Sequence, residues 1–389
     1  MTARSRIIGE PLPQGGYATR KIGSNPPTEE TQYPLGLVSR DRCDDIIGNP
    51  NNDNPLLIDK YKMDLRLMNG QEIGPGDSYK IYTSWIPTYF LTPSSRAQHA
   101  SITGLPSAAS DAIRLRAMTN PGRAEVSLPV FIGEARDLPH MIKSAGDSLL
   151  KRRKYWFRNS AGQYLSWEFG WKPLMNDLRK IVTFQSSVDS RVKELERLYS
   201  KGGLKRRMKL GHWGAVEQLN NRFIESSLGT VIQARETRFT QVERWGTIRW
   251  KPTTLPKSID RPELQRQAIK AVFGLSLQAE DVWNLVPWTW LIDWFTNAGD
   301  FLEAHGNRIP ALPGPANIMT KSESVIRWDR TTAPNWVKWE RSSMDYVTKE
   351  RYVGSGSLSA TLPFLSGRQM SILSALAVTR AKGSSRYRG

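Results

Sequence analysis

The residues best suited to chemistry form a basic quartet that runs directly into aromatic residues, at positions 151–158. Lysine and arginine attract phosphates through charge and counterion release, and exposed aromatic rings stack on unpaired bases. A second basic cluster lies at 205–209, and the carboxyl-terminal tail adds further arginines. We predict RNA binding by the members of these three groups, which are Lys151, Arg152, Arg153, Lys154, Tyr155, Trp156, Arg158, Lys205, Arg206, Arg207, Lys209, Arg386 and Arg388.

The charge of the chain is concentrated in the same places. Its 389 residues include 55 Lys and Arg against 37 Asp and Glu, a net charge of +18. Residues 143–210 hold 17 basic and 6 acidic residues, and residues 366–389 hold 5 basic residues and no acidic one. A single basic run is more often a solvated helix face, but two clusters and an acid-free tail together favour a polyanionic partner. Structured or single-stranded RNA suits this combination.

Residues for metal, redox or catalytic chemistry are scarce. Cys43 is the only cysteine, so an intramolecular disulfide and a thiolate metal site are excluded. The histidines, His99, His140, His212 and His305, lack the spacing of a zinc site. The chain has no phosphate loop, dinucleotide fingerprint or nucleophile elbow. We therefore predict no catalytic residue, metal, cofactor or small-molecule substrate, and a protein that is not an enzyme.

The length predicts two or three structural units, and the amino-terminal third is expected to be mainly β. Residues 1–40 are rich in proline and glycine and predict an extended loop. Alternating apolar and polar residues from Lys60 predict a half-buried strand that enters a hairpin at Asn69-Gly70. Residues 79–85 continue the two-residue period.

Later segments alternate between the two periods. Residues 204–250 and 317–353 predict long strands without a consistently apolar face, which suits a sheet that projects into solvent. Steps of three and four residues predict a helix over 174–199, ended by Gly202-Gly203, and a second helix from Pro262 to Leu275.

These patterns predict an α+β fold, an elongated protein with two regions. One region is a helical bundle, and the other is mainly antiparallel β with long projecting strands. The predicted β region comprises residues 1–130, 204–255 and 310–365. The predicted α-helical region comprises residues 131–203, 256–309 and 366–389.

The most apolar segment, at 285–295, is far shorter than the ~20 residues that span a bilayer, so no transmembrane segment is predicted. A buried core helix is favoured over a segment lying in a membrane interface. Asp293 in this helix is then a buried acid that pairs with an arginine or with backbone amides.

Residues 169–177 and 283–294 form two blocks rich in tryptophan and proline. Both blocks resemble motifs of the maturation proteins, or A proteins, of small single-stranded RNA bacteriophages. The first runs from Phe169 to Asp177 and resembles the family's Phe-Gly-Trp-x-Pro-Leu-x-x-Asp block. The second resembles the family's Trp-x-x-x-Pro and Asp-Trp segment, with Trp288-Thr289-Trp290 where Phe-Ser-Phe is expected. The residues that carry the resemblance are Phe169, Gly170, Trp171, Pro173, Leu174, Asp177, Trp283, Pro287, Asp293 and Trp294.

The resemblance implies a single-copy virion component that replaces a coat-protein dimer and is made in the bacterial host cytoplasm. It would bind the viral genomic single-stranded RNA, contact the coat protein, attach to a bacterial pilus and enter the cell with the RNA. The predicted β region would face outward on the receptor side, and the predicted α-helical region would face RNA and capsid. Two alternatives stay open at this point. One is a cellular basic RNA-binding protein or nucleic-acid enzyme, and the other is a host lysis protein that blocks cell-wall synthesis.

Overall fold

The computed structural model describes residues 2–47, 53–123, 184–253, 261–273, 309–354 and 371–372. The chain divides into two compact units. Unit 1 comprises Met1–Leu105, Lys209–Gly246 and Asn317–Val353, and unit 2 comprises Pro106–Met208, Thr247–Ala316 and Gly354–Gly389.

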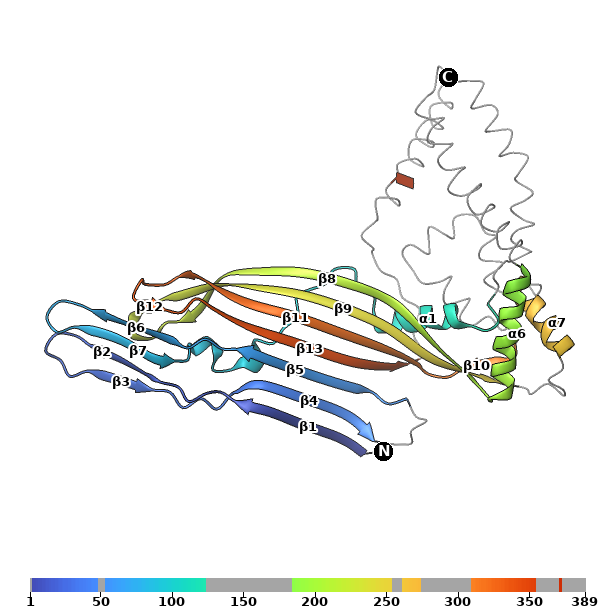
Figure 1. The fold of residues 1–389 in the computed structure, drawn as a ribbon, viewed down its shortest axis with the longest axis horizontal. Helices are drawn as coiled ribbons and strands as arrows, with labels where there is room; N and C mark the ends of the chain where they lie inside the picture. Colours follow the sequence, from blue (N-terminus) through green and yellow to red (C-terminus); the bar gives the residue numbers. More distant parts are fainter. Residues whose placement is uncertain are drawn as a thin grey trace, which may run out of the picture. The chain divides into compact units, whose positions relative to one another are not determined.

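Two sheets contain most of the described residues (Figure 1). The eight-stranded sheet has the order β1-β4-β5-β13-β11-β9-β10, and β8 pairs with β9. Its strands are β1 (Thr2–Pro11), β4 (Leu37–Ile47), β5 (Leu56–Asp64), β8 (Leu204–Glu225), β9 (Ile232–Pro252), β10 (Ala311–Pro313), β11 (Ala316–Thr332) and β13 (Arg341–Gly354). The five-stranded sheet has the order β12-β6-β7-β2-β3. Its strands are β2 (Tyr17–Lys21), β3 (Thr28–Thr31), β6 (Met68–Ile73), β7 (Tyr79–Trp85) and β12 (Val337–Lys338).

The amino-terminal residues form strands, so the prediction of an extended loop over 1–40 is wrong. The prolines and glycines that suggested a loop lie mainly at strand ends and in connections, as Pro11 does at the end of β1. β1 pairs antiparallel with β4, and Arg4 donates to Asp45 across the pair at 2.6 Å. Backbone pairing and ion pairs of this kind stabilise a strand without an apolar face.

The predicted hairpin at Asn69-Gly70 is also wrong, because both residues lie inside β6. β6 pairs with β7 across a shift in register between Met68 and Gly70, and Asn69 Oδ1 accepts the backbone N–H of Ser84 at 2.8 Å. Gly70 has a φ of 151° and pairs with Val337 of β12. A side chain at this position would meet the backbone of Trp336, so glycine here serves close strand approach. The predicted strands at Lys60 and at 79–85 are confirmed as β5 and β7.

The core of unit 1 lies between the two sheets. Met68 and Tyr82 of the five-stranded sheet and Tyr61 and Trp328 of the eight-stranded sheet belong to one buried cluster. Phe90, in the 3-10 helix η1 (Thr88–Phe90), meets the Trp328 ring edge-on with centroids 5.2 Å apart. A second 3-10 helix, η2 (Pro93–Ser95), follows, and η4 (Ser227–Gly229) joins β8 to β9.

The long strands are present, but β9 does not have two solvated faces as the sequence suggested. Its alternate residues are buried, and several of these are charged. Glu236 is 1% exposed and accepts hydrogen bonds from Arg238 at 2.6 Å and from the Tyr89 hydroxyl at 2.9 Å. A polar side chain can lie in the interior when its hydrogen-bond partners are present. Its residue type alone would suggest a position on the surface.

His99 connects three strands of the eight-stranded sheet. Its ring nitrogens lie 2.6 Å from the Ser324 hydroxyl of β11 and 2.9 Å from the Thr348 hydroxyl of β13. Ser324 is in turn 2.7 Å from Thr240 of β9. The ring stacks on Tyr346 with centroids 4.4 Å apart. Desolvation in this site lowers the pKa of His99 from 6.5 to about 4, opposed by the charge of Asp59.

Unit 1 is therefore expected to lose stability in acid through His99. The pKa of His99 is lower in the folded chain than in the unfolded one, so its contribution is complete above pH 6.5 and falls as the pH drops toward 4. The full loss is about 3 kcal/mol. Urea unfolding of the wild type and of His99→Gln at several pH values checks this. Because carboxylates titrate in the same range, the two chains must differ in pH dependence; parallel curves would contradict the assignment.

Unit 2 contains the helices α1 (Ala108–Thr119), α6 (Phe184–Ser200) and α7 (Arg261–Phe273). Ser107 caps α1 by accepting the Ser110 N–H at 3.1 Å. α6 and α7 lie side by side (Figure 1), and the Tyr199 hydroxyl of α6 lies 3.0 Å from Gln267 Oε1 of α7. Within the described residues, the helices predicted over 174–199 and 262–275 are confirmed. Gly202, with a φ of 59°, follows the end of α6.

The predicted fold class is wrong. The described residues are mostly β, and α1, α6 and α7 do not make a helical bundle beside a β region. The error has a physical cause, since the helical period is plain in the sequence whereas prolines, glycines and charges conceal the strands within 1–47. The predicted apolar helix at 285–295, with Asp293, lies outside the described residues. No helix in the described part of the chain is long and apolar enough to cross a membrane.

Candidate nucleic-acid interface

The structure describes one of the three predicted RNA-binding groups, the cluster at the start of β8. The other predicted residues lie outside the described part of the chain, namely Lys151, Arg152, Arg153, Lys154, Tyr155, Trp156, Arg158, Arg386 and Arg388. The family-block residues also lie outside it, namely Phe169, Gly170, Trp171, Pro173, Leu174, Asp177, Trp283, Pro287, Asp293 and Trp294.

The cluster at the start of β8 is divided between the two faces of the strand. Successive side chains of a strand point to opposite faces, so Lys205 and Arg207 share one face and Arg206 takes the other. Arg206 forms an ion pair with Glu194 of α6 at 2.6 Å. Lys205 and Arg207 are exposed. The structure therefore separates one of the predicted RNA contacts, Arg206, from its neighbours.

The end of β9 repeats this arrangement. Trp250 is 2% exposed, and its indole N–H donates to Thr119 of α1 at 3.3 Å. Arg249 and Lys251, on either side of Trp250, point to the opposite face, and both are exposed. Because β8 pairs with β9, these exposed basic side chains of the two strands form one basic surface in unit 2. We call Lys205, Arg207, Arg249 and Lys251 the basic strand face.

Lys209, the remaining residue of the predicted cluster, lies further along β8 in unit 1. It is exposed and forms an ion pair with Glu243 of β9 at 3.3 Å. This ion pair shows that Lys209 and Glu243 lie on the same side of the paired strands. Side chains two residues apart on a strand lie on the same face. Steps of two from Lys209 reach Arg207 and Lys205, and steps of two from Glu243 reach Arg249 and Lys251. The four residues of the basic strand face are therefore expected to share one side of the paired strands.

The electrostatics of the basic strand face favour anions. Neither 203–208 nor 247–253 contains an acidic residue. Basic side chains two residues apart on a strand are ~6.6–6.8 Å apart along it. Such a row, repeated on the paired strand, presents several cations to consecutive phosphates of an extended polyanion.

Sequence reasoning missed Arg249 and Lys251. They are two isolated basic residues on either side of a tryptophan, not a run, and the pairing of β8 with β9 is not visible in either segment alone. The only signal was the alternation Arg-Trp-Lys in a segment already predicted to be a strand.

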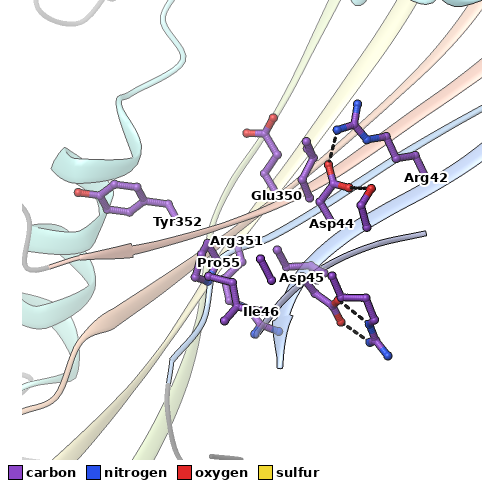
Figure 2. A pocket seen from close by; sticks show the side chains of 13 residues that line it. Arg42, Asp44, Asp45, Ile46, Pro55, Glu350, Arg351 and Tyr352 are labelled. Carbon is purple, nitrogen blue, oxygen red and sulfur yellow. Dashed lines mark hydrogen bonds and ion pairs between the residues drawn. The ribbon is translucent and has the colours of Figure 1, made fainter. Parts of the chain in front are cut away.

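The described residues also contain a pocket of about 700 Å³ in unit 1, where strands β1, β4, β5 and β13 meet (Figure 2). Its carboxylates are already paired. Asp44 accepts from Ser5 at 2.6 Å and pairs with Arg42 at 2.8 Å, and both interactions lower its pKa. Arg4 lowers the pKa of Asp45 in the same way. Carboxylates held ionised by such partners suit a structural role better than acid–base chemistry.

Metal ligands are not gathered in the described ranges, where no group of three or more His, Cys, Asp or Glu side chains is placed to hold an ion. Cys43 is a free cysteine on β4. Among the described residues, the arrangement whose chemistry suits a ligand is the basic strand face, which concentrates positive charge.

Two comparisons with known proteins address the family. Residues 130–312 match the family described as phage maturation protein. This range contains both sequence blocks and the basic strand face. The chain is also similar to maturation protein A2 of Enterobacteria phage SP, with 26% identity over 159 residues. That alignment covers 39% of this chain and 31% of the relative, so the chain spans about a third of the relative's length. The resemblance inferred from the two blocks is thus confirmed, since residues 130–312 are similar to the phage maturation proteins.

Proposed function

We propose that the protein is the maturation protein of a single-stranded RNA phage, a virion component that binds the viral genomic RNA. The match of residues 130–312 to the maturation-protein family carries this proposal. The basic strand face lies inside the matched range and supplies the charge that RNA binding requires. The basic cluster at 151–158 lies in the same range and adds cations and aromatic rings.

The remaining roles in this proposal follow from the family. The protein replaces one coat-protein dimer as a single copy, attaches the particle to a bacterial pilus and enters the cell with the RNA. It is made in the host cytoplasm and acts without a cofactor and without catalysis. A division of labour is part of the proposal. Apart from the basic strand face, the β region faces outward, whereas that face and residues 131–203, 256–309 and 366–389 hold RNA and capsid.

Particle assembly tests the proposal as a whole. The chain, the coat protein and the viral RNA are produced together in bacteria, and the particles are purified. We expect the chain to sediment with particles at about one copy each, and particles without it to lose attachment to piliated cells. A chain that stays out of the particles, or particles that attach equally well without it, would contradict the proposal.

The exposed side chains of β9 and β11 allow a test of the proposal that the β region faces outward and attaches to the host. Phe239 is 41% exposed, and the guanidinium of Arg327 lies 5.5 Å from the centre of its ring. We expect Phe239→Ser with Arg327→Glu to lower infection about tenfold or more, as expected when an aromatic anchor and a cation are removed from the centre of an interface. The RNA content of the particles should not change, and nuclease-protected RNA per particle measures it. Loss of packaged RNA would count against the division of labour.

A further inference from the structure

The connection between β3 and β4 exposes two large apolar side chains. It links the five-stranded sheet to the eight-stranded sheet and contains the sequence Tyr33-Pro34-Leu35, which we call the apolar loop. Tyr33 is 84% exposed and Leu35 is 98% exposed, so no described part of the chain covers either side chain. Within the described ranges, no large apolar residue is more exposed than Leu35.

The apolar loop is held at both of its ends. Before it, the side chain of Gln32 pairs with the backbone of Ile86. Its Nε2 donates to the Ile86 carbonyl at 2.7 Å, and its Oε1 accepts the Ile86 N–H at 2.8 Å. After it, the Gly36 carbonyl accepts the Leu12 N–H at 3.0 Å. Pro34 fixes its own φ between these two attachments, so the loop is restrained and loses little conformational entropy when a partner binds it.

The apolar loop differs from the isolated apolar residues of an ordinary surface. Single exposed apolar side chains are common and need no partner. Here a tyrosine and a leucine extend into solvent from one restrained loop of three residues. Aromatic anchors that enter a pocket contribute most to the binding energy of many interfaces, and tyrosine supplies a large contact area with few rotatable bonds. The apolar loop thus has the properties of an anchor that enters a pocket of another molecule.

The surroundings of the apolar loop are acidic. Residues 7–16 and 25–39 meet beside it through backbone hydrogen bonds of 3.0 and 3.2 Å. Together they contain Glu10, Glu29 and Glu30, all exposed, and no Lys or Arg, in a chain whose net charge is +18. An anionic lipid surface or a nucleic acid would be repelled here. A protein surface with basic residues around an apolar pocket would be attracted.

We propose that the apolar loop binds in an apolar pocket of a partner protein, and that basic residues at the rim of this pocket face the three glutamates. The partner is a subunit of the host pilus, and in this respect the inference rests on the proposed function, in which the β region attaches to the host. The apolar loop is a contact in addition to Phe239 and Arg327, because those residues lie on β9 and β11.

Binding of particles to isolated pili tests the inference. The particles are assembled as in the test of the proposed function, with Tyr33→Ser and Leu35→Ser in the chain. We expect their affinity for pili to fall by at least about tenfold, because two anchors are removed. Ile22→Ser with Ile73→Ser is the matched control, since these isoleucines of unit 1 are 52% and 78% exposed, and binding should be unchanged. A loop variant that binds like the wild type, or equal weakening by both pairs, overturns the inference.

Two further arms separate this inference from the proposed function and from a lipid partner. Particles without the chain that bind pili as well as complete particles overturn the proposed function and the inference together. Loss of binding by those particles, but not by the loop variant, overturns the inference alone. Vesicles of anionic phospholipid are the lipid probe. Binding of wild-type particles to these vesicles that the loop variant loses, with pilus binding unchanged, also overturns the inference.

The salt dependence of pilus binding tests the basic rim. Replacing Glu10, Glu29 and Glu30 by Gln removes three negative charges beside the apolar loop. We expect binding to weaken several-fold at low salt and to approach that of the wild type as salt is raised, because salt screens exposed charges. Stronger binding of this variant at low salt would show that the rim of the pocket is acidic, which overturns the inferred charge complementarity.

Discussion

Replacing Lys205, Arg207, Arg249 and Lys251 by Gln is expected to reduce the salt dependence of RNA binding by about 3 in the slope of log K against log salt concentration. Each single-stranded phosphate that is no longer neutralised removes about 0.7 from that slope. Affinity should fall by a similar factor for RNAs of different sequence, because these side chains contact phosphates and not base edges. Titrations of the purified chain at several salt concentrations measure both quantities.

The control for this variant removes the same amount of charge elsewhere. Arg235, Lys62, Lys338 and Lys349 are exposed residues of unit 1 outside the basic strand face. Their replacement by Gln should leave the slope nearly unchanged if binding is local. An equal fall in slope for both chains would show that only total charge matters. A slope that is unchanged in the strand-face variant would remove these four residues from the interface and leave RNA binding to other parts of the chain.

The cluster at 151–154 is tested in the same titration. Replacing Lys151, Arg152, Arg153 and Lys154 by Gln should also lower the slope, by about 0.7 for each phosphate that these side chains neutralise. If the two clusters bind one RNA together, the combined variant should show the sum of the two changes. A slope unchanged by the 151–154 replacement would contradict the assignment of this cluster to RNA binding.

The Glu225→Ala variant is expected to lose about 3–5 kcal/mol of unfolding free energy, the largest single-residue effect that we expect for this chain. Glu225 is 1% exposed, and both oxygens of its carboxylate accept hydrogen bonds. Oε2 accepts from the Trp85 indole at 2.9 Å and from the Thr88 backbone at 2.9 Å. Oε1 accepts from the backbone N–H groups of Ser226 and Ser227 at 2.9 and 2.8 Å.

Alanine at this position leaves these donors without their acceptor, which costs more than the loss of the bonds themselves. Denaturant unfolding followed by tryptophan fluorescence measures the change. Glu29→Ala is the control, because Glu29 is exposed on β3 and should change stability by less than about 0.5 kcal/mol. Similar stabilities for the two variants would show that the carboxylate of Glu225 is not a structural acceptor.

Periodicity predicted the strands and helices in which apolar residues recur at the spacing of a buried face. The long strands β8, β9, β11 and β13 were expected from composition, and α6 and α7 from three- and four-residue steps. β1 was missed because all its residues are exposed, so no apolar alternation marks it. Backbone pairing with β4 and ion pairs such as Arg4–Asp45 stabilise β1. Neither can be predicted from the sequence of β1 alone, because both depend on the separate segment Leu37–Ile47.

Buried polar residues caused the second kind of error. Glu225 and Glu236 are nearly inaccessible, yet in the sequence they look like surface residues. Only the fold shows that Trp85 and Tyr89, which are distant in the sequence, supply their donors. For the same reason the basic strand face could not be predicted from the sequence, because it combines residues of β8 and β9 that only strand pairing brings together. The resemblance to the family could be recognised from the sequence because each of its two blocks is a contiguous motif.

The central claim is that this chain binds the genome of an RNA phage, and sequencing of RNA crosslinked to the protein tests it most directly. The protein is purified from infected cells at near-physiological salt, where nonspecific phosphate binding is weak. We predict enrichment of discrete segments of one phage genome, with peptide crosslinks that include the basic strand face or residues 151–158. Diffuse recovery of host and phage RNA without enriched segments would contradict the claim.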